Sequence, residues 1–294
     1  MRVGLVGLGA MGRPIGLRLL RAGHTLGVWG RRAEAVQPLR LAGACVHATP
    51  AGLARHCEVL LTVVTAGADV EAVGFGDEGL IHGAAPGTVW VDHSTIAPET
   101  ARALAARAAP RGLAMLDAPV SGGAQGAVEG TLAIMVGGPA AALERVRPLL
   151  QQIGRRIVHV GESGAGQVAK ACNQMIMVAC IEAVAEALRL AARSGVDPAK
   201  VQAALAGGSA ASRVLEVFGT RMAARDFCAG VEARLHHKDF GILLAAAAVG
   251  GVPLPIAALV RQQLNALMAQ GWGRDDTSSL LRVLEAGSQA AADG

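Results

Sequence analysis

Short runs rich in β-branched residues alternate with segments of Ala, Leu and Arg between Arg2 and about Gly161. Turn signals such as Ala85-Pro86-Gly87 separate these runs, and the alternation is typical of strands and helices that build a parallel sheet. We therefore expect a doubly wound α/β fold in this part of the chain. The pattern predicts strands over residues 2–6, 25–29, 44–47, 59–64, 88–92, 114–117, 132–136 and 157–160.

The pattern changes after Gly161. Residues 167–194 hold strong helix formers without an internal proline or glycine, and Gly195 follows them. At about 1.5 Å per residue such a helix would be roughly 40 Å long, which is more than one small domain needs. The remaining chain is also helical in pattern, with helix starts indicated at Asp197, Asp239, Pro255 and Asp276.

These patterns predict a Rossmann domain over residues 1–162 and an all-helical domain over residues 163–294, joined by the long helix. That helix is apolar on most of its sides, so most of its sides need to be covered. We expect it to contribute to a subunit interface, in a homodimer or a homotetramer.

Residues 241–260 carry no charge over the length of a membrane span. Gly250, Gly251, Pro253 and Pro255 interrupt this stretch, and each of them disfavours a continuous helix. We expect two buried helical segments joined by a turn, and no membrane-spanning helix.

Composition narrows the class of protein. The 294 residues are 52% hydrophobic and 17% charged, with a formal net charge of +4. Basic residues are scattered and aromatic residues make up only 2%, which argues against a nucleic-acid partner. The five cysteines are odd in number and form no C-x-x-C pair, as in a cytoplasmic protein with reduced thiols. The eight histidines show no metal-ligand spacing, so no metal site is expected.

A glycine-rich run lies between the first predicted strand and a helical segment that ends near Ala22. In a Rossmann βαβ unit the first glycine of such a run makes a tight turn, the second lets the backbone approach a pyrophosphate, and the third packs the helix on the strand. A dinucleotide is therefore expected to bind here, and a glycine-rich turn without a ligand is the alternative. The run consists of Gly7, Leu8, Gly9, Ala10, Met11 and Gly12.

The second predicted strand, 25–29, is followed by Gly30, Arg31 and Arg32. An NAD-selective site usually carries an acid here, which accepts a hydrogen bond from the ribose 2′-hydroxyl. Two guanidinium groups suit a 2′-phosphate instead, because they offer charge-assisted donors. NADP(H) is the preferred cofactor on this reading, with NAD(H) as the second choice. The alternative is that these arginines are solvated residues at the start of the helix 33–41.

Polar residues also follow the predicted strand 88–92, at a sheet edge where active sites are common. These residues are His93, Ser94 and Thr95. The hydroxyls of Ser94 and Thr95 could reach a nicotinamide ribose. As an alternative, one of them caps the helix that begins near Pro98, and the two roles are compatible.

A second loop with candidate binding residues follows the predicted strand 114–117 and contains Ser121, Gly122 and Gly123. Successive backbone N–H groups in a glycine loop, with a hydroxyl beside them, form a nest for a carboxylate. The alternative is a plain turn.

The first turns of the predicted long helix carry Lys170, Asn173 and Gln174. Their spacing of three and four residues places the three side chains on one helix face. Desolvation by apolar neighbours lowers the pKa of a lysine, which would let Lys170 exchange a proton near neutral pH. The alternative is a lysine whose ammonium group extends to water.

Five segments, taken in order and spacing, resemble the β-hydroxyacid dehydrogenases over nearly the whole chain. This family includes 3-hydroxyisobutyrate dehydrogenase, tartronate semialdehyde reductase and the glyoxylate/succinic semialdehyde reductases. The segments read GLGAMGRPIG, DAPVSGG, GTLAIMVGG, GAGQVAKACNQ and LHHKD.

The resemblance implies roles for the residues of the substrate site. Lys170 matches the catalytic lysine, which protonates the carbonyl oxygen in reduction and removes the hydroxyl proton in oxidation. Residues 121–123 match the loop that binds the substrate carboxylate, and Ser121 belongs to the catalytic set. Asn173 matches the amide that orients the substrate oxygen in one branch, whereas other members carry that amide where this chain has Gln174.

The resemblance also implies contacts with the cofactor. Thr95 matches a contact on the nicotinamide side, and Lys238 matches a lysine of the helical domain that closes over the cofactor. Val64 and Thr65, at the end of the strand 59–64, complete the expected cofactor set.

The resemblance implies an NADPH-dependent oxidoreductase that interconverts a small 2- or 3-oxo semialdehyde acid and its hydroxyacid. The motifs are most like those of tartronate semialdehyde reductase or 3-hydroxyisobutyrate dehydrogenase, and glyoxylate/succinic semialdehyde reductase is the alternative. A non-catalytic NADP-binding scaffold is the alternative from another class, and retention of Lys170 beside Asn173 argues against it.

Overall fold

The structure, a computed structural model, describes residues 1–290. The chain divides into two units, Met1–Lys170 (unit 1) and Ala171–Gly294 (unit 2), and helix α8 (Ala165–Arg193) continues from the first into the second. The functional boundary expected after residue 162 stays a prediction.

Unit 1 is built on a sheet in which nine strands are described. The order β3-β2-β1-β4-β5-β6, with parallel neighbours throughout, is that of a Rossmann fold, and the predicted fold class is confirmed. The strands are β1 (Arg2–Val6), β2 (Thr25–Trp29), β3 (Cys45–Val46), β4 (Val59–Thr62), β5 (Val89–Asp92), β6 (Ala114–Asp117), β7 (Val120–Ser121), β8 (Leu132–Gly137) and β9 (Gly154–Gly161).

The far edge of the sheet departs from the expected parallel arrangement. Strand β8 pairs antiparallel with β6 and β7, and β9 pairs parallel with β8. Strand β7 was missed because two residues are too few for a side-chain alternation to show. Strand β9 begins at Gly154 rather than at residue 157, and β3 is shorter than predicted.

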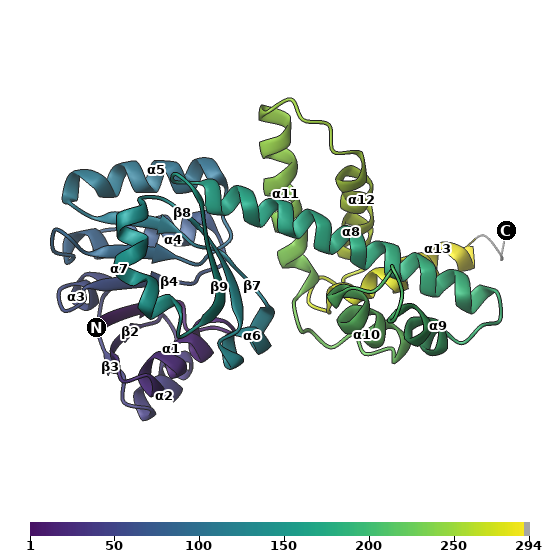
Figure 1. The fold of residues 1–294 in the computed structure, drawn as a ribbon, viewed down its shortest axis with the longest axis horizontal. Helices are drawn as coiled ribbons and strands as arrows, with labels where there is room; N and C mark the ends of the chain where they lie inside the picture. Colours follow the sequence, from purple (N-terminus) through teal and green to yellow (C-terminus); the bar gives the residue numbers. More distant parts are fainter. Residues whose placement is uncertain (291–294) are drawn as a thin grey trace. The chain divides into compact units, whose positions relative to one another are not determined.

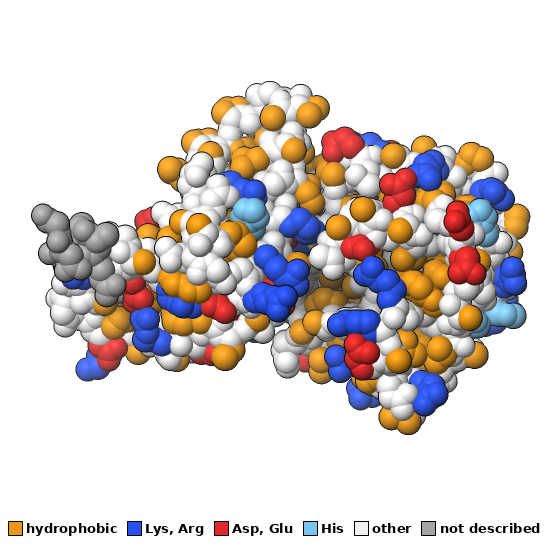
Figure 2. Space-filling view, turned by 180° about the vertical axis from the view of Figure 1, so that it is seen from behind, with side chains coloured by type: hydrophobic (Ala, Val, Ile, Leu, Met, Phe, Trp, Pro, Cys, Tyr) orange, Lys and Arg blue, Asp and Glu red, His pale blue; other side chains and the backbone are white. Residues whose placement is uncertain are grey.

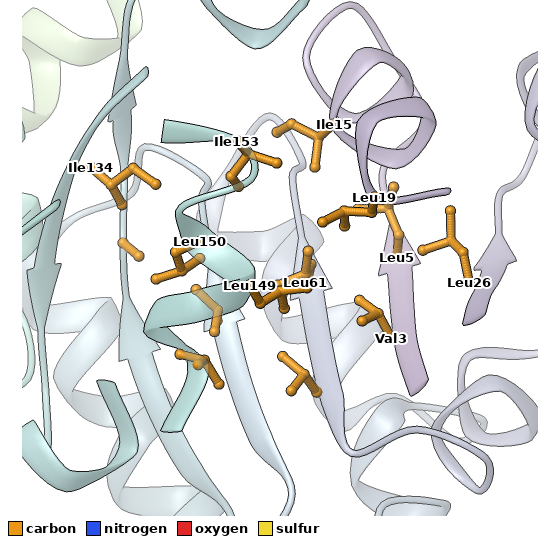
Figure 3. Packing of buried hydrophobic residues seen from close by; sticks show 14 of the residues in the cluster. Val3, Leu5, Ile15, Leu19, Leu26, Leu61, Ile134, Leu149, Leu150 and Ile153 are labelled. Atoms are coloured by element: carbon orange, nitrogen blue, oxygen red, sulfur yellow. The ribbon is translucent and has the colours of Figure 1, made fainter. Parts of the chain in front are cut away.

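Helices cover both faces of this sheet (Figure 1). Leu61 of β4 packs in a cluster with Leu19 and Leu149, on the face of α1, α2 and α7 (Figure 3). Its neighbour Leu60 belongs to a second cluster with Trp90, on the face of α3, α4 and α5. This alternation along a strand follows from the two-residue period of β structure. The helices are α1 (Gly12–Arg21), α2 (Ala33–Leu41), α3 (Pro50–Ala54), α4 (Gly67–Phe75), α5 (Pro98–Ala108), α6 (Gly123–Glu129) and α7 (Ala140–Leu150), with the 3-10 turns η1 (Leu80–His82) and η2 (Ala109–Arg111).

Within its described residues the regular elements of unit 2 are all helices, as predicted, and an isolated β-bridge joins Glu232 and Asp276. Its core packs Ile181 of α8 against Phe240 and Leu264. The elements after α8 are α9 (Pro198–Leu205), the π-helix η3 (Leu215–Gly219), α10 (Thr220–Ala223), α11 (Ala233–Val249), α12 (Pro255–Ala269), the 3-10 turn η4 (Thr277–Ser279) and α13 (Leu280–Ala290).

Three of the four predicted helix starts are confirmed and one is wrong. Asp197 caps α9 through a hydrogen bond from the Ala199 N–H (2.9 Å), Pro255 is the first residue of α12, and Asp276 caps η4. Asp239 instead lies inside α11, where it is buried. Aspartate favours a helix start because its side chain can cap the first N–H groups, but here side-chain partners hold it within the helix.

The uncharged stretch 241–260 forms the end of α11, a turn and the start of α12, as predicted. The expected burial is confirmed for Leu243, Ala257 and Val260 but not for the whole stretch, because Val249 is 85% exposed and Leu259 is 71% exposed. Figure 2 shows hydrophobic side chains at the surface of this helical hairpin. Neither this stretch nor any other helix within residues 1–290 has the length and apolar character to cross a membrane.

A buried glutamate in α8 makes the stability of unit 2 depend on pH. Both carboxylate oxygens of Glu182 lack a hydrogen-bond partner among the described residues. Burial, with a contribution from the like charge of Glu186, raises the pKa of Glu182 from 4.5 to about 7. The folded state therefore holds this proton more tightly than the unfolded chain, and the free energy of unfolding falls as pH rises from 4.5 to about 7.

We expect Glu182→Gln to raise the free energy of unfolding by about 1–3 kcal/mol near pH 8, with little gain below about pH 5, because glutamine carries no charge to bury. Urea unfolding at the two pH values measures the difference. The exposed neighbour provides a comparison, since Glu186→Gln is expected to give a smaller gain. An equal gain at both pH values would show that the carboxylate charge is not the cause.

Candidate active site

The glycine-rich run between β1 and α1 has the backbone geometry of a phosphate cradle. Gly7 has a φ of +93°, and a Cβ at Gly12 would lie 1.8 Å from the Gly7 carbonyl oxygen, so the helix start packs closely on the strand end. A Cβ at Gly9 would enter open space. Within the described chain no side chain caps α1 and its first turn holds no acid. Its first N–H groups thus fit a dinucleotide phosphate, while Leu8, Ala10 and Met11 lie along the same turn.

The two arginines after β2 are exposed and each faces a carboxylate. Nη2 of Arg31 lies 3.7 Å from Oδ1 of Asp69, which belongs to the first turn of α4. Nε of Arg32 lies 3.7 Å from Oε1 of Glu34. Arg31 therefore points toward the first turn of α4, whereas Arg32 pairs with a residue of α2, the helix that it precedes.

The ends of β4 and β5 are joined through the carboxylate of Asp92. Its Oδ1 accepts hydrogen bonds from Thr62 Oγ1 (2.6 Å) and from Ser94 Oγ (2.7 Å), while Ser94 Oγ accepts one from the Val64 N–H (2.9 Å). Thr65 and Thr95 extend beyond this connection at the same sheet edge. The network fixes the backbone of two predicted cofactor segments.

Burial perturbs two titratable groups at the end of β5. The pKa of Asp92 rises to about 6 because its carboxylate is fully buried, although the hydrogen bonds from Thr62 and Ser94 oppose this rise. Burial lowers the pKa of His93 to about 4. Its Nδ1 lies 2.7 Å from the Ala118 carbonyl oxygen, which can only accept, so this nitrogen carries the proton of a neutral ring.

A second buried carboxylate, Asp117 at the end of β6, receives the start of α8. Its Oδ1 accepts from the Gly164 N–H (2.7 Å) and its Oδ2 from the Gln167 N–H (2.9 Å). Burial raises the pKa of Asp117 and these N–H groups oppose the rise. The Gln167 side chain adds a link to the β5 loop, donating to the Ser94 carbonyl (2.8 Å) and accepting from the Ile96 N–H (3.1 Å).

Lys170 lies one helical turn beyond these bonds. Its buried Nζ donates to the Val120 carbonyl oxygen at 2.8 Å. Ser121 is the next residue, and Gly122 (φ +132°) and Gly123 (φ +63°) follow with backbone angles that favour glycine. Unit 1 thus brings the predicted lysine and the predicted carboxylate loop together.

The remaining predicted side chains form a connected group in unit 2. Asn173 Nδ2 donates to Gln174 Oε1 (2.9 Å), and Gln174 Nε2 donates to Asp239 Oδ2 (2.6 Å). Lys238 Nζ lies 3.0 Å from Asp239 Oδ1. Asp239, interpreted from sequence only as a helix start, therefore links the predicted amides to the predicted lysine.

Among the residues of this arrangement, Thr62, Asp92, Asp117, Gln167 and Asp239 had no predicted role in the site. Asp117 and Gln167 belong to the segments DAPVSGG and GAGQVAKACNQ, on which the family resemblance rests. The sequence gives no sign of the contact between them. No group of three or more His, Cys, Asp or Glu side chains in residues 1–290 could hold a metal ion.

Family descriptions match both parts of the chain. Residues 2–161 match the NAD-binding domain of 6-phosphogluconate dehydrogenase, and residues 164–284 match the NAD-binding domain of NADP-dependent 3-hydroxyisobutyrate dehydrogenase. Both descriptions name NAD-binding parts of pyridine-nucleotide dehydrogenases.

Individual proteins are similar over nearly the full length. The chain is 41% identical to 2-hydroxy-3-oxopropionate reductase of Escherichia coli (strain K12), covering 97% of each chain. It is 37% identical to an NAD-dependent L-serine dehydrogenase of Pseudomonas aeruginosa, covering 97% of this chain and 98% of the relative. The crystal structure of 3-hydroxyisobutyrate dehydrogenase from Salmonella typhimurium superimposes with a TM-score of 0.89 at 30% identity, covering 96% of this chain and 99% of that one. The chain therefore belongs to the β-hydroxyacid dehydrogenase family and is an NAD(P)-dependent oxidoreductase.

Proposed function

We propose that this enzyme interconverts a small semialdehyde carboxylic acid and its hydroxyacid, with NADP(H) as the preferred cofactor. The observation that carries the proposal is the buried Lys170 ammonium group, 2.8 Å from the Val120 carbonyl and directly before the loop 121–123. A proton donor beside backbone N–H groups suits a substrate with an oxygen to protonate and a carboxylate to bind.

In the proposed reaction each group of the chain has one task. When bound at the glycine-rich run, NAD(P)H would be the source of the hydride that reduces the carbonyl carbon. Lys170 donates a proton to the carbonyl oxygen as the C=O π bond breaks, and it recovers a proton from solvent. In oxidation Lys170 removes the hydroxyl proton. The N–H groups of Gly122 and Gly123, with the Ser121 hydroxyl, hold the carboxylate so that the carbonyl faces the lysine.

Between the two candidate amides we assign the substrate contact to Asn173. The Gln174 side chain is buried, with one N–H donated to Asp239 at 2.6 Å and its Oε1 accepting from Asn173, so protein partners hold both ends of the amide. Asn173 is only partly buried, and one N–H of its Nδ2 donates to Gln174 Oε1, so in this proposal the second N–H donates to the substrate oxygen. Gln174 acts in this proposal by orienting Asn173.

The proposed cofactor contacts follow the Rossmann crevice. Gly7–Gly12 bind the pyrophosphate, Arg31 and Arg32 face the 2′-phosphate, and Val64, Thr65 and Thr95 line the path toward the nicotinamide. Lys238 of α11 is also proposed as a cofactor contact. The proposed preference for NADP(H) rests on the two arginines that follow β2, at the sequence position where an NAD-selective enzyme usually has an acidic residue.

The relatives and the sequence resemblance together suggest the candidate substrates. The E. coli relative is a 2-hydroxy-3-oxopropionate reductase and the Salmonella structure is a 3-hydroxyisobutyrate dehydrogenase, and their substrates stand first. Glyoxylate and succinic semialdehyde are the alternative. The L-serine dehydrogenase adds L-serine, which is also a β-hydroxyacid.

We further propose that the protein is a homo-oligomer with helices of unit 2 at the interface. Ile176 and Leu190 of α8 are 60% and 69% exposed, and α11 and α12 also present large apolar side chains. A second copy of the chain would cover them. Three expectations stay predictions. They are a dimeric or tetrameric assembly, a cytoplasmic location and the lack of a nucleic-acid partner.

Oxidation of NADPH and NADH is expected to be fastest with tartronate semialdehyde or methylmalonate semialdehyde, in a panel that includes glyoxylate and succinic semialdehyde. L-serine is tested separately, by the reduction of NADP⁺ and NAD⁺. The loop 121–123 should make the carboxylate necessary, so each aldehyde is paired with its uncharged analogue as a control. Binding of NADPH without turnover of any member would favour a non-catalytic scaffold instead.

Lys170→Met is expected to lower kcat by about 10²- to 10⁴-fold, because it removes the proton donor while keeping an unbranched side chain of similar length. The dissociation constant for NADPH should stay within about threefold of the wild-type value, as measured by calorimetry. Lys200→Met, at an exposed lysine of α9, is the matched control and should leave kcat unchanged. A kcat within about tenfold of wild type for Lys170→Met would exclude the proposed role.

A further inference from the structure

The ion pair between Arg31 and Asp69 crosses the strand that carries the glycine-rich run. Arg31 follows β2 and Asp69 lies in α4, which follows β4, while β1 lies between β2 and β4 in the sheet. With strands about 4.8 Å apart, the pair spans roughly 10 Å over the carboxyl end of β1. This is the switch point at which an open α/β sheet binds its dinucleotide.

The carboxylate is the fixed partner in this pair. Asp69 Oδ2 accepts a hydrogen bond from the Ala66 N–H at 3.2 Å, at the start of α4, and its side chain is 32% exposed. The Arg31 side chain is 78% exposed and contacts Asp69 Oδ1 at 3.7 Å. Asp69 therefore fixes the position of the Arg31 guanidinium more than Arg31 fixes the position of the Asp69 carboxylate.

We propose that Asp69 is a specificity-determining residue of the cofactor site, which limits the preference for NADP(H) over NAD(H). This inference rests on the proposed function, in which Arg31 faces the 2′-phosphate. A carboxylate paired with that guanidinium neutralises part of its charge, and it also repels a phosphate placed nearby. A 2′-hydroxyl carries no charge and meets neither penalty.

The expected size of the effect is modest because the pair is largely solvated. A single charge a few ångströms from a phosphate at high dielectric changes affinity by about three- to tenfold. Asp69→Asn removes the charge and keeps an oxygen that can accept from the Ala66 N–H, so the start of α4 is preserved.

The chain offers a matched control on the same helix. Glu71, two residues further along α4, forms an ion pair with Arg107 of α5, on the opposite face of the sheet from α1. Glu71→Gln makes the same change in net charge without touching Arg31. A general effect of charge would therefore appear in both variants, and an effect through the cofactor site only in Asp69→Asn.

The test is calorimetric titration of wild type, Asp69→Asn and Glu71→Gln with NADP⁺ and with NAD⁺. Asp69→Asn should raise the ratio of the NAD⁺ to the NADP⁺ dissociation constant by about three- to tenfold, mainly through tighter NADP⁺ binding. Glu71→Gln should leave this ratio unchanged. The ratio of kcat/KM values for NADPH and NADH should shift in the same sense as the binding ratio.

A ratio for Asp69→Asn that falls, or that stays within about twofold of wild type, would overturn the inference. If the thermal midpoint shows that this variant is unfolded, Asp69→Ser, which also keeps an oxygen acceptor, replaces it in the same titrations. A wild-type preference for NAD⁺ would instead refute the proposed NADP(H) preference, while the shift caused by Asp69→Asn would still be measured independently.

Discussion

The buried carboxylate of Asp117 determines how the sheet meets the long helix. An ionised carboxylate removed from water needs strong donors, and here the Gly164 and Gln167 N–H groups at the start of α8 supply them at 2.7 and 2.9 Å. The positive end of the helix dipole adds to this attraction. The approach is close, since a Cβ at Gly137 would lie 2.6 Å from Asp117 Oδ1. Glycine at this position is therefore a packing requirement.

The chemistry of the site depends on that junction. Lys170 lies three residues after Gln167, and Val120 lies three residues after Asp117, so the Lys170–Val120 contact is set by one cap. Gln167 also ties the helix to the β5 loop through Ser94. A proton donor held by regular secondary structure keeps its place better than one on a free loop, which suits a reaction that depends on alignment.

Local patterns predicted the regular elements, because strand alternation, the glycine-rich run and the helix-forming stretch 167–194 are all written in neighbouring residues. The errors have a different origin. Asp239 has the local character of a helix cap but is held inside α11 by Gln174, 65 residues away in sequence. The contact of Asp117 with Gly164 spans 47 residues, and nothing in either segment alone indicates it. The predicted burial of 241–260 holds for one side of the two helices only, because the single chain buries Val260 but leaves Val249 exposed.

The most direct measurement of the central claim is a crystal structure of the enzyme with NADP⁺ and tartronate, a hydroxyacid that carries a carboxylate on either side of its hydroxyl. We expect one carboxylate on the N–H groups of Gly122 and Gly123, and the hydroxyl within hydrogen-bond distance of Lys170 Nζ. Tartronate bound with its hydroxyl more than about 4 Å from Lys170 Nζ, or away from the loop 121–123, would contradict the account.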